Sequence, residues 1–466
     1  MKNNIKFIGR LIVAFSLMFS ACGESFLDVD PSNSVLAEKA IRSEKDVEVA
    51  INGLYNDMQD RHWMSSTYLA IPGVMADGIG INVKNSNRYT ASYGYYVQKG
   101  YADPLGAWKL PYRLIRKANL ILEKVDNIKG DKVELNHYKG VVLGLRAFAH
   151  FDLVRMFAHP YSQGGDALGI PIVTGVLPST ADVARNTVGE VYTQVIKDLN
   201  DATKLLNPKK IERGKFHYWG AKALLARVYL YHEDWDLAAK IATEVLENNN
   251  LASREQYMQI FNGNNPESIF ELINTAVDNG RGDNIGKLVN PKPKGYGDVF
   301  ITEHLQALFK PSDIRHSLIA KSDSIYYPNK YPTGGVSDNV QIIRASEVSL
   351  IAAEAYAKGT NPRKDELSLE YLNKVITRSV NKDAALSNLT GQALVDSILV
   401  ERERELFCEG HRLFDLTRNN KEIRRGDDYW SAKEYKFIKP NNPKTILPIP
   451  LSEMNVNSKM KQNPGY

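Results

Sequence analysis

Cysteine is nearly absent from this chain of 466 residues, which contains two, Cys22 and Cys408. With Cys22 assigned to another role below, no internal disulfide can form, so stability has to come from an ordinary packed core. Beyond Cys22 there is also no apolar run near the roughly 20 residues that a membrane-spanning helix requires. The rest of the chain is therefore not expected to cross a membrane as a helix.

An excess of charge of one sign is missing as well. The chain has 59 basic and 54 acidic residues, for a formal net charge of +5. This balance argues against nucleic acid as a partner, because nucleic-acid-binding surfaces need clustered basic residues. The 43% of hydrophobic and 24% of charged residues are typical of a globular protein and exclude a disordered tail.

The sequence also lacks several common motifs of enzyme active sites. The sequence has no His-Glu-x-x-His zinc helix, no Gly-x-Ser-x-Gly nucleophile elbow, no Gly-rich phosphate loop with Lys, and no Cys-x-x-Cys pair. The pair Glu401 and Glu405 could suggest glycoside hydrolysis, which requires two acids flanking the bond. Arg402 and Arg404 lie beside them and would keep both ionised, whereas a general acid must hold its proton. We therefore predict no catalytic residue, no metal and no cofactor.

The first segment has the features of a secretion signal. A basic start, Lys2, Lys6 and Arg10, is followed by the apolar run Leu11 to Phe19 and by the small residues Ser20 and Ala21. That run is too short to span a bilayer, and cleavage after Ala21 would leave Cys22 first. Several acyl chains on Cys22 would anchor the chain firmly, since one chain alone holds only marginally. We predict a signal peptide at 1–21, lipidation of Cys22 and a tether at 22–35; the alternative is an ordinary signal peptide with Cys22 incidental.

Helical periodicity dominates the rest of the chain. Apolar residues recur every three or four positions in Tyr138 to Phe157 and fill a second face as well, which predicts a helix buried between two neighbours. Gly220 to Asn248 resembles a tetratricopeptide hairpin, with alanines at the crossing. Looser pairs are expected for Trp108 to Val125 with the Tyr138 helix, and for Ser346 to Ala357 with Leu367 to Ile376. The predicted fold class is all-α, on a tetratricopeptide-like scaffold of helical hairpins.

Two long tracts interrupt this pattern, Arg61 to Gly106 and Leu251 to Asn339, and both are rich in Gly, Asn, Pro and Tyr. Irregular segments of this length in a compact protein are usually functional or disordered, and the many aromatic residues argue against disorder. We therefore expect a single domain over 36–466 with long irregular ligand-binding insertions. Its two regions cover about 36–200 and about 215–466.

Six segments together resemble the SusD/RagB family of outer-membrane nutrient-binding lipoproteins. They are Cys22 to Pro31, Trp108 to Glu123, Arg146-Ala-Phe-Ala-His-Phe-Asp-Leu-Val-Arg155, the helix Glu401-Arg-Glu-Arg-Glu-Leu-Phe-Cys-Glu-Gly-His411-Arg-Leu-Phe-Asp-Leu-Thr-Arg418, Leu447-Pro-Ile-Pro450 and Gln462-Asn-Pro-Gly-Tyr466. Each segment is weak alone, but together they follow the family's order across the whole mature chain. The resemblance implies a lipid anchor in the outer membrane, facing the cell exterior, and a SusC-like TonB-dependent barrel as partner. It also implies glycan binding in most members and peptide binding in some.

A glycan site needs aromatic and polar side chains together, because the C–H faces of sugar rings stack on aromatic rings while the hydroxyls need hydrogen-bonding partners. The resemblance implies a ligand face built from the first tract and the later one. The candidate ligand-binding residues are Trp63, Asp77, Asn82, Arg88, Tyr93, Tyr95 and Tyr96 in the first tract, and Tyr296 and Tyr327 in the second. Trp108, Trp219 and Trp235 lie on helical patterns and are assigned to core packing.

Three functions remain open from the sequence. The favoured hypothesis is a surface lipoprotein that binds an oligosaccharide or polysaccharide fragment and delivers it to a SusC-like transporter. The second is the same scaffold binding peptides, and the third, from another class, is a surface glycoside hydrolase. A screen of glycans against peptides separates the first two, and release of products would identify the third.

Overall fold

The computed structural model describes residues 41–466 except 179, 281, 335–336 and 360–363, so the predicted signal peptide, tether and lipidation site lie outside the described residues. The long helices are α3 (Glu44–Met58), α6 (Ala102–Val125), α7 (Lys132–Phe157), α8 (Val188–Leu205), α9 (Tyr218–Tyr231), α10 (Trp235–Leu246), α13 (Ala345–Lys358), α14 (Asp365–Ser379) and α15 (Gly391–Leu406). The shorter ones are α4 (Thr67–Val74), α5 (Thr90–Tyr93), α11 (Ile285–Val289), α12 (Glu303–Ala307), α16 (Arg412–Arg418) and α17 (Leu451–Val456). Helices thus account for most of the regular structure, which confirms the predicted fold class.

The strands are short and pair in antiparallel twos. They are β1 (Ile79–Ile81) with β3 (Val299–Ile301), β2 (Ser268–Leu272) with β6 (Val340–Arg344), β4 (Ile319–Ser322) with β5 (Ile325–Pro328), and β7 (Ile423–Arg424) with β8 (Phe437–Ile438). Each pair joins two segments that are distant or irregular, and none of these pairs forms a separate layer of the fold.

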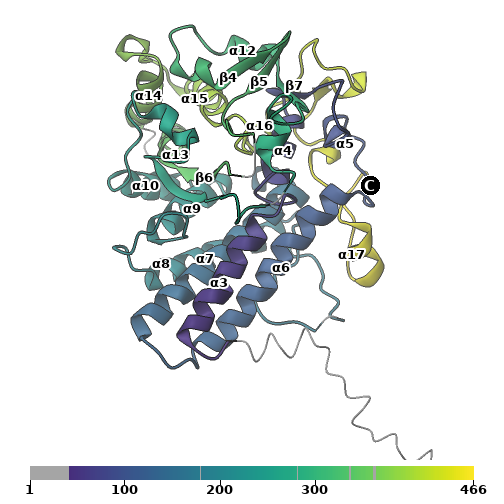
Figure 1. Ribbon diagram of the computed structural model, residues 1–466, viewed down its shortest axis with the longest axis vertical. Coiled ribbons are helices and arrows are strands. Elements are labelled where there is room, and N and C mark those ends of the chain that lie inside the picture. Colours follow the sequence, from purple (N-terminus) through teal and green to yellow (C-terminus); the bar gives the residue numbers. More distant parts are fainter. Residues whose placement is uncertain (1–40, 179, 281, 335–336, 360–363) are drawn as a thin grey trace, which may run out of the picture.

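The predicted helical pairs form the scaffold. Helices α3, α6, α7 and α8 stand side by side at the lower end of Figure 1, and α7 packs between α6 and α8 as its two apolar faces require. The hairpins α9–α10 and α13–α14 follow, as expected for tetratricopeptide-like units. Trp108 is buried, and Trp219 and Trp235 are partly buried against the core. None of the described helices is both long and apolar enough to span a bilayer.

Two long helices, α3 and α8, were not predicted. Each begins with a capping box: the Ser43 hydroxyl accepts from the Asp46 N–H, and the Asp46 carboxylate accepts from the Ser43 N–H at 2.9 Å. Thr187 and Glu190 make the same reciprocal pair at the start of α8. This spacing of a hydroxyl residue and an acid is visible in the sequence and could have located both helices.

The motif from Glu401 to Arg418 was expected to be one helix, and that prediction is wrong. Helix α15 ends at Leu406, and α16 begins at Arg412. Between them Cys408 has a φ of 59° and Gly410 a φ of 81°, values that break an α-helix. A Cβ on Gly410 would lie 2.4 Å from the backbone oxygen of Tyr68, so the close approach to α4 requires glycine. The break turns α16 toward the first tract.

A buried charge cluster joins the second tract to the scaffold. At its centre, Glu405 accepts hydrogen bonds from Arg315 at 2.9 Å, Arg344 at 2.6 Å and Arg378 at 2.8 Å. The remaining members are Glu267, Asp313, Lys330, Glu401 and Glu409. Although burial opposes ionisation, these cations hold the pKa of Glu405 well below its usual range. This direction agrees with the predicted ionised state of Glu405, but its partners come from three distant elements and not from Arg402 or Arg404.

The two irregular tracts meet at the end of the scaffold opposite the lower ends of α3 and α6, where their short elements gather at the top of Figure 1. Strand β1 of the first tract pairs with β3 of the second, with Ile79 opposite Ile301 and Ile81 opposite Val299. Both tracts thus contribute to one surface, as the resemblance implied.

Candidate functional site

A surface hollow of about 390 Å³ lies where the two tracts meet the start of α6. The first tract and the segment around α11 both contribute to its walls. The lining residues are Arg61, His62, Ser66, Asn87, Arg88, Tyr89, Thr90, Ala91, Tyr96, Tyr101, Ala102, Asp103, Asp283, Asn284, Leu288 and Tyr296. Aromatic and polar groups therefore share one concave surface, which is the composition of a small-molecule site.

The polar wall of the hollow is organised around Asp283. Its carboxylate accepts hydrogen bonds from Arg61 at 2.5 Å, from Arg88 at 3.0 Å and from the Tyr296 hydroxyl at 2.7 Å. The Arg88 guanidinium also lies 4.0 Å from the centre of the Tyr296 ring, within range of a cation–π contact. Partial burial opposes ionisation, but the Tyr296 hydrogen bond and the two arginines lower the pKa of Asp283. The carboxylate is thus charged at neutral pH, and the groups around it are held in fixed orientations.

The rest of the hollow combines exposed rings with hydrogen-bonding groups. Tyr96 is 49% exposed and Tyr101 38%, so each has ring surface free for a ligand. Burial and the nearby Arg61 lower the pKa of His62, which is neutral at pH 7. Its Nδ1 is buried and has no hydrogen-bond partner among the described residues. This atom packs against Gly106, where an added Cβ would lie 2.8 Å from it, so it is not open to a ligand.

Three of the predicted ligand-binding residues, Arg88, Tyr96 and Tyr296, line the hollow. Trp63 does not: it is fully buried, and its indole nitrogen donates to Asp152 at 2.8 Å. Asn82 and Tyr327 are also buried, and the Asn82 amide donates to the Tyr327 hydroxyl at 3.4 Å. Because these side chains hold the tracts together and offer no free surface, they take no part in the site proposed below.

Tyr93 and Tyr95 are buried beneath the segment between β7 and β8. The ring of Tyr95 stacks on Tyr435 with centroids 5.2 Å apart, and its hydroxyl donates to the Met75 carbonyl at 2.5 Å. The guanidinium of Arg425 lies 5.1 Å from the Tyr93 ring and 4.9 Å from the Tyr95 ring. These two tyrosines anchor the first tract to a C-terminal segment, whereas Tyr96 alone points its ring outward.

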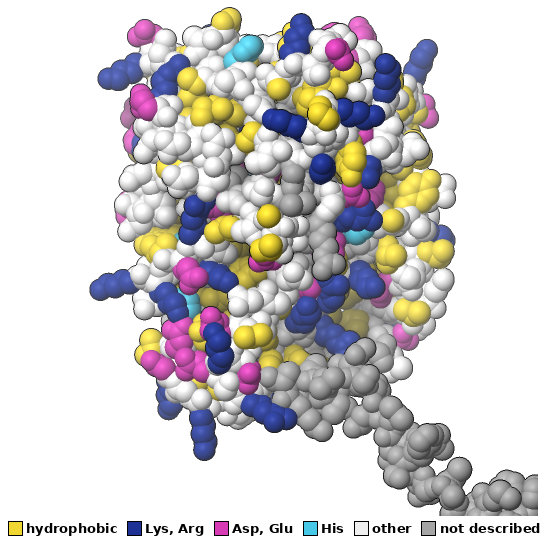
Figure 2. Space-filling view, in the orientation of Figure 1, with side chains coloured by type: hydrophobic (Ala, Val, Ile, Leu, Met, Phe, Trp, Pro, Cys, Tyr) yellow, Lys and Arg dark blue, Asp and Glu magenta, His cyan; other side chains and the backbone are white. Residues whose placement is uncertain are grey.

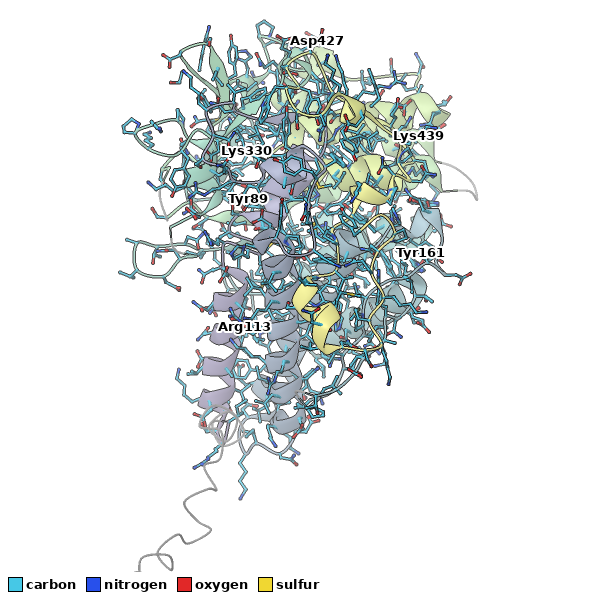
Figure 3. The ribbon with its side chains drawn as sticks, turned by 90° about the vertical axis from the view of Figure 1, so that its right-hand side faces the viewer. Tyr89, Arg113, Tyr161, Lys330, Asp427 and Lys439 are labelled. Atoms are coloured by element: carbon cyan, nitrogen blue, oxygen red, sulfur yellow. The ribbon has the colours of Figure 1, made fainter. Side chains whose placement is uncertain are left out.

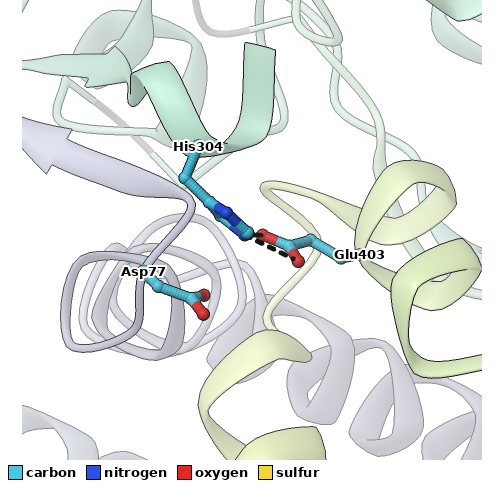
Figure 4. Close-up of side chains that lie close together, drawn as sticks. All are labelled: Asp77, His304 and Glu403. Carbon is cyan, nitrogen blue, oxygen red and sulfur yellow. Dashed lines mark hydrogen bonds and ion pairs between the residues drawn. The ribbon is translucent and has the colours of Figure 1, made fainter. Parts of the chain in front are cut away.

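Asp77 is buried in a separate cluster behind the hollow. Arg412 donates to both Asp77 oxygens, at 2.7 and 2.8 Å, and pairs with Glu403 at 2.7 Å. His304 of α12 contacts the same Glu403 at 3.1 Å, and Figure 4 shows the three acid and imidazole groups facing one another. Their ligand atoms lie within 4.8 Å of one another, a spacing suited to a cation. Arg412 already supplies that positive charge, so the cluster ties α12 and α16 to the first tract.

Among the residues of the hollow that were not predicted from the sequence are Arg61, His62, Tyr101, Asp103 and Asp283. All five lie in the two tracts already singled out, next to aromatic or basic neighbours. Their side-chain types fitted a binding site, but their convergence depends on the pairing of β1 with β3 and was not visible in the sequence.

Two family models match the chain. One, described as starch-binding and associating with the outer membrane, matches residues 25–230, and the other, the SusD family, matches residues 317–466. A SusD superfamily protein from Bacteroides thetaiotaomicron has the same fold with a TM-score of 0.84 and 30% sequence identity, over 91% of this chain and 100% of that one. This chain belongs to the SusD/RagB family. The resemblance noted in the sequence is therefore confirmed.

Other SusD-like relatives cover nearly the whole chain. A putative sugar-binding protein from Bacteroides vulgatus is 33% identical, with a TM-score of 0.84 over 92% of this chain and 99% of that one. The SusD-like protein P25 from Formosa agariphila is 25% identical over 98% of this chain and 99% of its own. The SusD/RagB family is thus a carbohydrate-binding family associated with the outer membrane.

Proposed function

We propose that this protein binds a glycan in the hollow, at the outer surface of the outer membrane, and delivers it to a SusC-like TonB-dependent barrel. The observation that carries the proposal is the hollow itself, with exposed Tyr96 and Tyr101 beside the oriented cluster of Asp283, Arg88 and Tyr296. Rings supply stacking surface, and the polar cluster supplies partners for hydroxyls. Figure 2 shows both basic and acidic side chains on the face that it draws.

A binding screen tests this function directly. The protein lacking residues 1–22 is assayed by calorimetry against starch, laminarin, xylan, mannan and pectin, and in parallel against mixed peptides. Binding to at least one polysaccharide, with none to peptides, is the expected result. Binding to peptides alone would assign the chain to the second hypothesis, because peptide amides can use the same polar cluster.

The hydrolase hypothesis is tested in the same samples. Burial raises the pKa of Asp103, which makes it the carboxyl of the hollow best suited to hold a proton. We expect no release of reducing ends from any bound polysaccharide. Release that disappears in Asp103→Asn would replace the binding-only function by catalysis.

Tyr95 and Tyr96 are neighbours in sequence with opposite expected roles. Tyr96→Ala should weaken binding of the polysaccharide found in the screen by about tenfold, because it removes an exposed stacking ring. The melting temperature should hardly change. Tyr95→Ala should instead lower the free energy of unfolding by about 3 kcal/mol, since Tyr95 is only 2% exposed and loses its stack on Tyr435. Calorimetry and urea unfolding on both variants measure the two effects, and an unfolding loss in Tyr96→Ala equal to that in Tyr95→Ala would contradict this division.

Anchoring through Cys22 has a separate test. Cys22→Ala should be exported but recovered in the soluble fraction, because the acyl chains that would hold the protein on the membrane are lost. The fold should be unchanged, as judged by circular dichroism and melting temperature. A variant that stays in the membrane fraction after a high-salt wash would show that the chain is held in another way.

A further inference from the structure

The loop between β7 and β8, residues 425–436, docks on the first tract beside the hollow. Its anchor is Arg425, whose guanidinium donates to the backbone oxygens of Val74 and Ala76 at 3.0 Å each, and of Tyr93 at 2.6 Å. The Tyr429 ring also packs edge-on against Tyr93, with centroids 4.9 Å apart. Figure 3 places Asp427 of this loop at the top of the molecule, with Tyr89 lower and Arg113 of α6 lower still. The loop is thus held firmly on the first tract.

Trp430 is the exposed aromatic residue at the tip of this loop. Its indole N–H donates to the Ile81 carbonyl at the end of β1, and its ring lies 5.6 Å from Tyr93. Nevertheless 44% of the side chain is exposed. A tryptophan that is pinned by its nitrogen and open on its surface loses little conformational freedom when a ligand covers it.

The exposed surface of the loop adjoins the hollow through Tyr96. The Tyr96 ring and the Ser431 hydroxyl crowd the same side of Gly94: a Cβ added there would lie 2.4 Å from Tyr96 Cε1 and 2.7 Å from Ser431 Oγ. Ser431, the residue after Trp430, therefore packs beside the Tyr96 ring, which lines the hollow. Tyr96 and Trp430, both about half exposed, border one continuous surface.

We propose that Trp430 is a second stacking platform for the glycan, which receives the sugar residues that extend out of the hollow past Tyr96. Sugar C–H groups carry a slight positive charge and are attracted to the negative face of an indole ring. Ser431 supplies a hydroxyl beside that platform. This inference rests on the proposed function and adds a consequence to it: affinity should rise with the length of the oligosaccharide until the chain reaches Trp430.

The test compares oligosaccharides of two to seven sugar units, prepared from the polysaccharide bound in the screen, on the parent protein and on Trp430→Ala. In the parent, affinity should rise with length and then level off. In Trp430→Ala the shortest oligosaccharides that bind should keep their affinity, while the longest should bind about five- to tenfold more weakly. Trp430→Phe, which keeps a ring but cannot donate to Ile81, should recover part of that loss.

Phe437→Ala provides the matched control. Phe437 lies on β8 of the same hairpin and is 58% exposed, and no ring contact or hydrogen bond of its side chain with another described residue is found. Its replacement should leave affinity unchanged at every length, and an equal loss there would show that the hairpin and not the indole matters. If Trp430→Ala binds all lengths like the parent while Tyr96→Ala is weakened, the second platform is wrong and the proposed function stands. If the parent binds no glycan, the proposed function itself fails.

Discussion

Glu405→Gln should lower the free energy of unfolding by about 3 to 5 kcal/mol at neutral pH. The change keeps the size of the side chain but removes the carboxylate to which Arg315, Arg344 and Arg378 all donate. Three fully or nearly fully buried guanidinium groups would then lack their shared counter-charge. Because these groups come from the second tract, β6 and α14, the variant should also loosen the second tract. Urea unfolding monitored by tryptophan fluorescence measures the loss.

The pH dependence of this loss has a definite sign. The pKa of Glu405 is lowered in the folded state from an ordinary value of 4.5, so its stabilisation is present above that pH and lost as pH falls toward the folded value. The difference between parent and variant should therefore be largest near pH 7 and shrink below about pH 4.5. Glu370→Gln is the control: Glu370 pairs with Lys374 at 2.9 Å but is 54% exposed, and its loss should cost less than about 1 kcal/mol. A similar small cost for Glu405→Gln would mean that the cluster does not hold the tracts in place.

Arg412→Met should also lower the free energy of unfolding, by about 3 kcal/mol. Arg412 is the cation shared by Asp77 and Glu403, and removing it leaves two buried carboxylates side by side. Burial raises the pKa of Asp77, but the charge and the hydrogen bond of Arg412 lower that pKa overall. In Arg412→Met, Asp77 would therefore lose both its ion pair and the group that keeps it ionised. Thermal unfolding at pH 7 measures the change. Arg424→Met, which removes an exposed partner of Glu422, should have almost no effect.

Zinc binding gives a second test of Arg412→Met. Without Arg412, the carboxylates of Asp77 and Glu403 and the imidazole of His304 would form a three-ligand group of the kind that binds zinc. Zinc should therefore raise the melting temperature of Arg412→Met and not that of the parent, since a ligand that binds only the folded state stabilises it. If His304→Gln added to Arg412→Met leaves the zinc effect unchanged, the metal is bound elsewhere and the geometry of the cluster is wrong.

The need for anchors explains why so few of the predicted loop residues line the hollow. A tract that contains only short helices and strands needs many anchors to remain in one conformation. Trp63, Tyr93 and Tyr95 serve this purpose through buried rings, and Asp77 serves it through Arg412. The side chains left over, such as Tyr96 and Arg88, are then presented in fixed positions, which favours binding because less freedom is lost.

Local patterns were sufficient for the scaffold, because a helix is defined by residues three and four positions apart. The apolar spacing in Tyr138 to Phe157 predicted α7, and the alanine-rich hairpin predicted α9 and α10. A local signal is also present at α3 and α8, because each of these helices begins with a capping box. The family motifs added the identity of the fold and made the two tracts the expected ligand face.

What the sequence by itself determined is therefore most of the helical scaffold, the family and the two segments that meet at the proposed ligand surface. Which residues of those segments are exposed was decided only by the tertiary structure. Asp77 meets Arg412 across 335 positions, and Tyr93 and Tyr95 are covered by Arg425 and Tyr435 from the far end of the chain. An aromatic residue in a polar loop has the same local sequence whether it is buried or open, because burial depends on which distant segment packs against it. For Tyr95 and Tyr96, adjacent in the chain, that packing alone makes one a core residue and leaves the other free to meet a ligand.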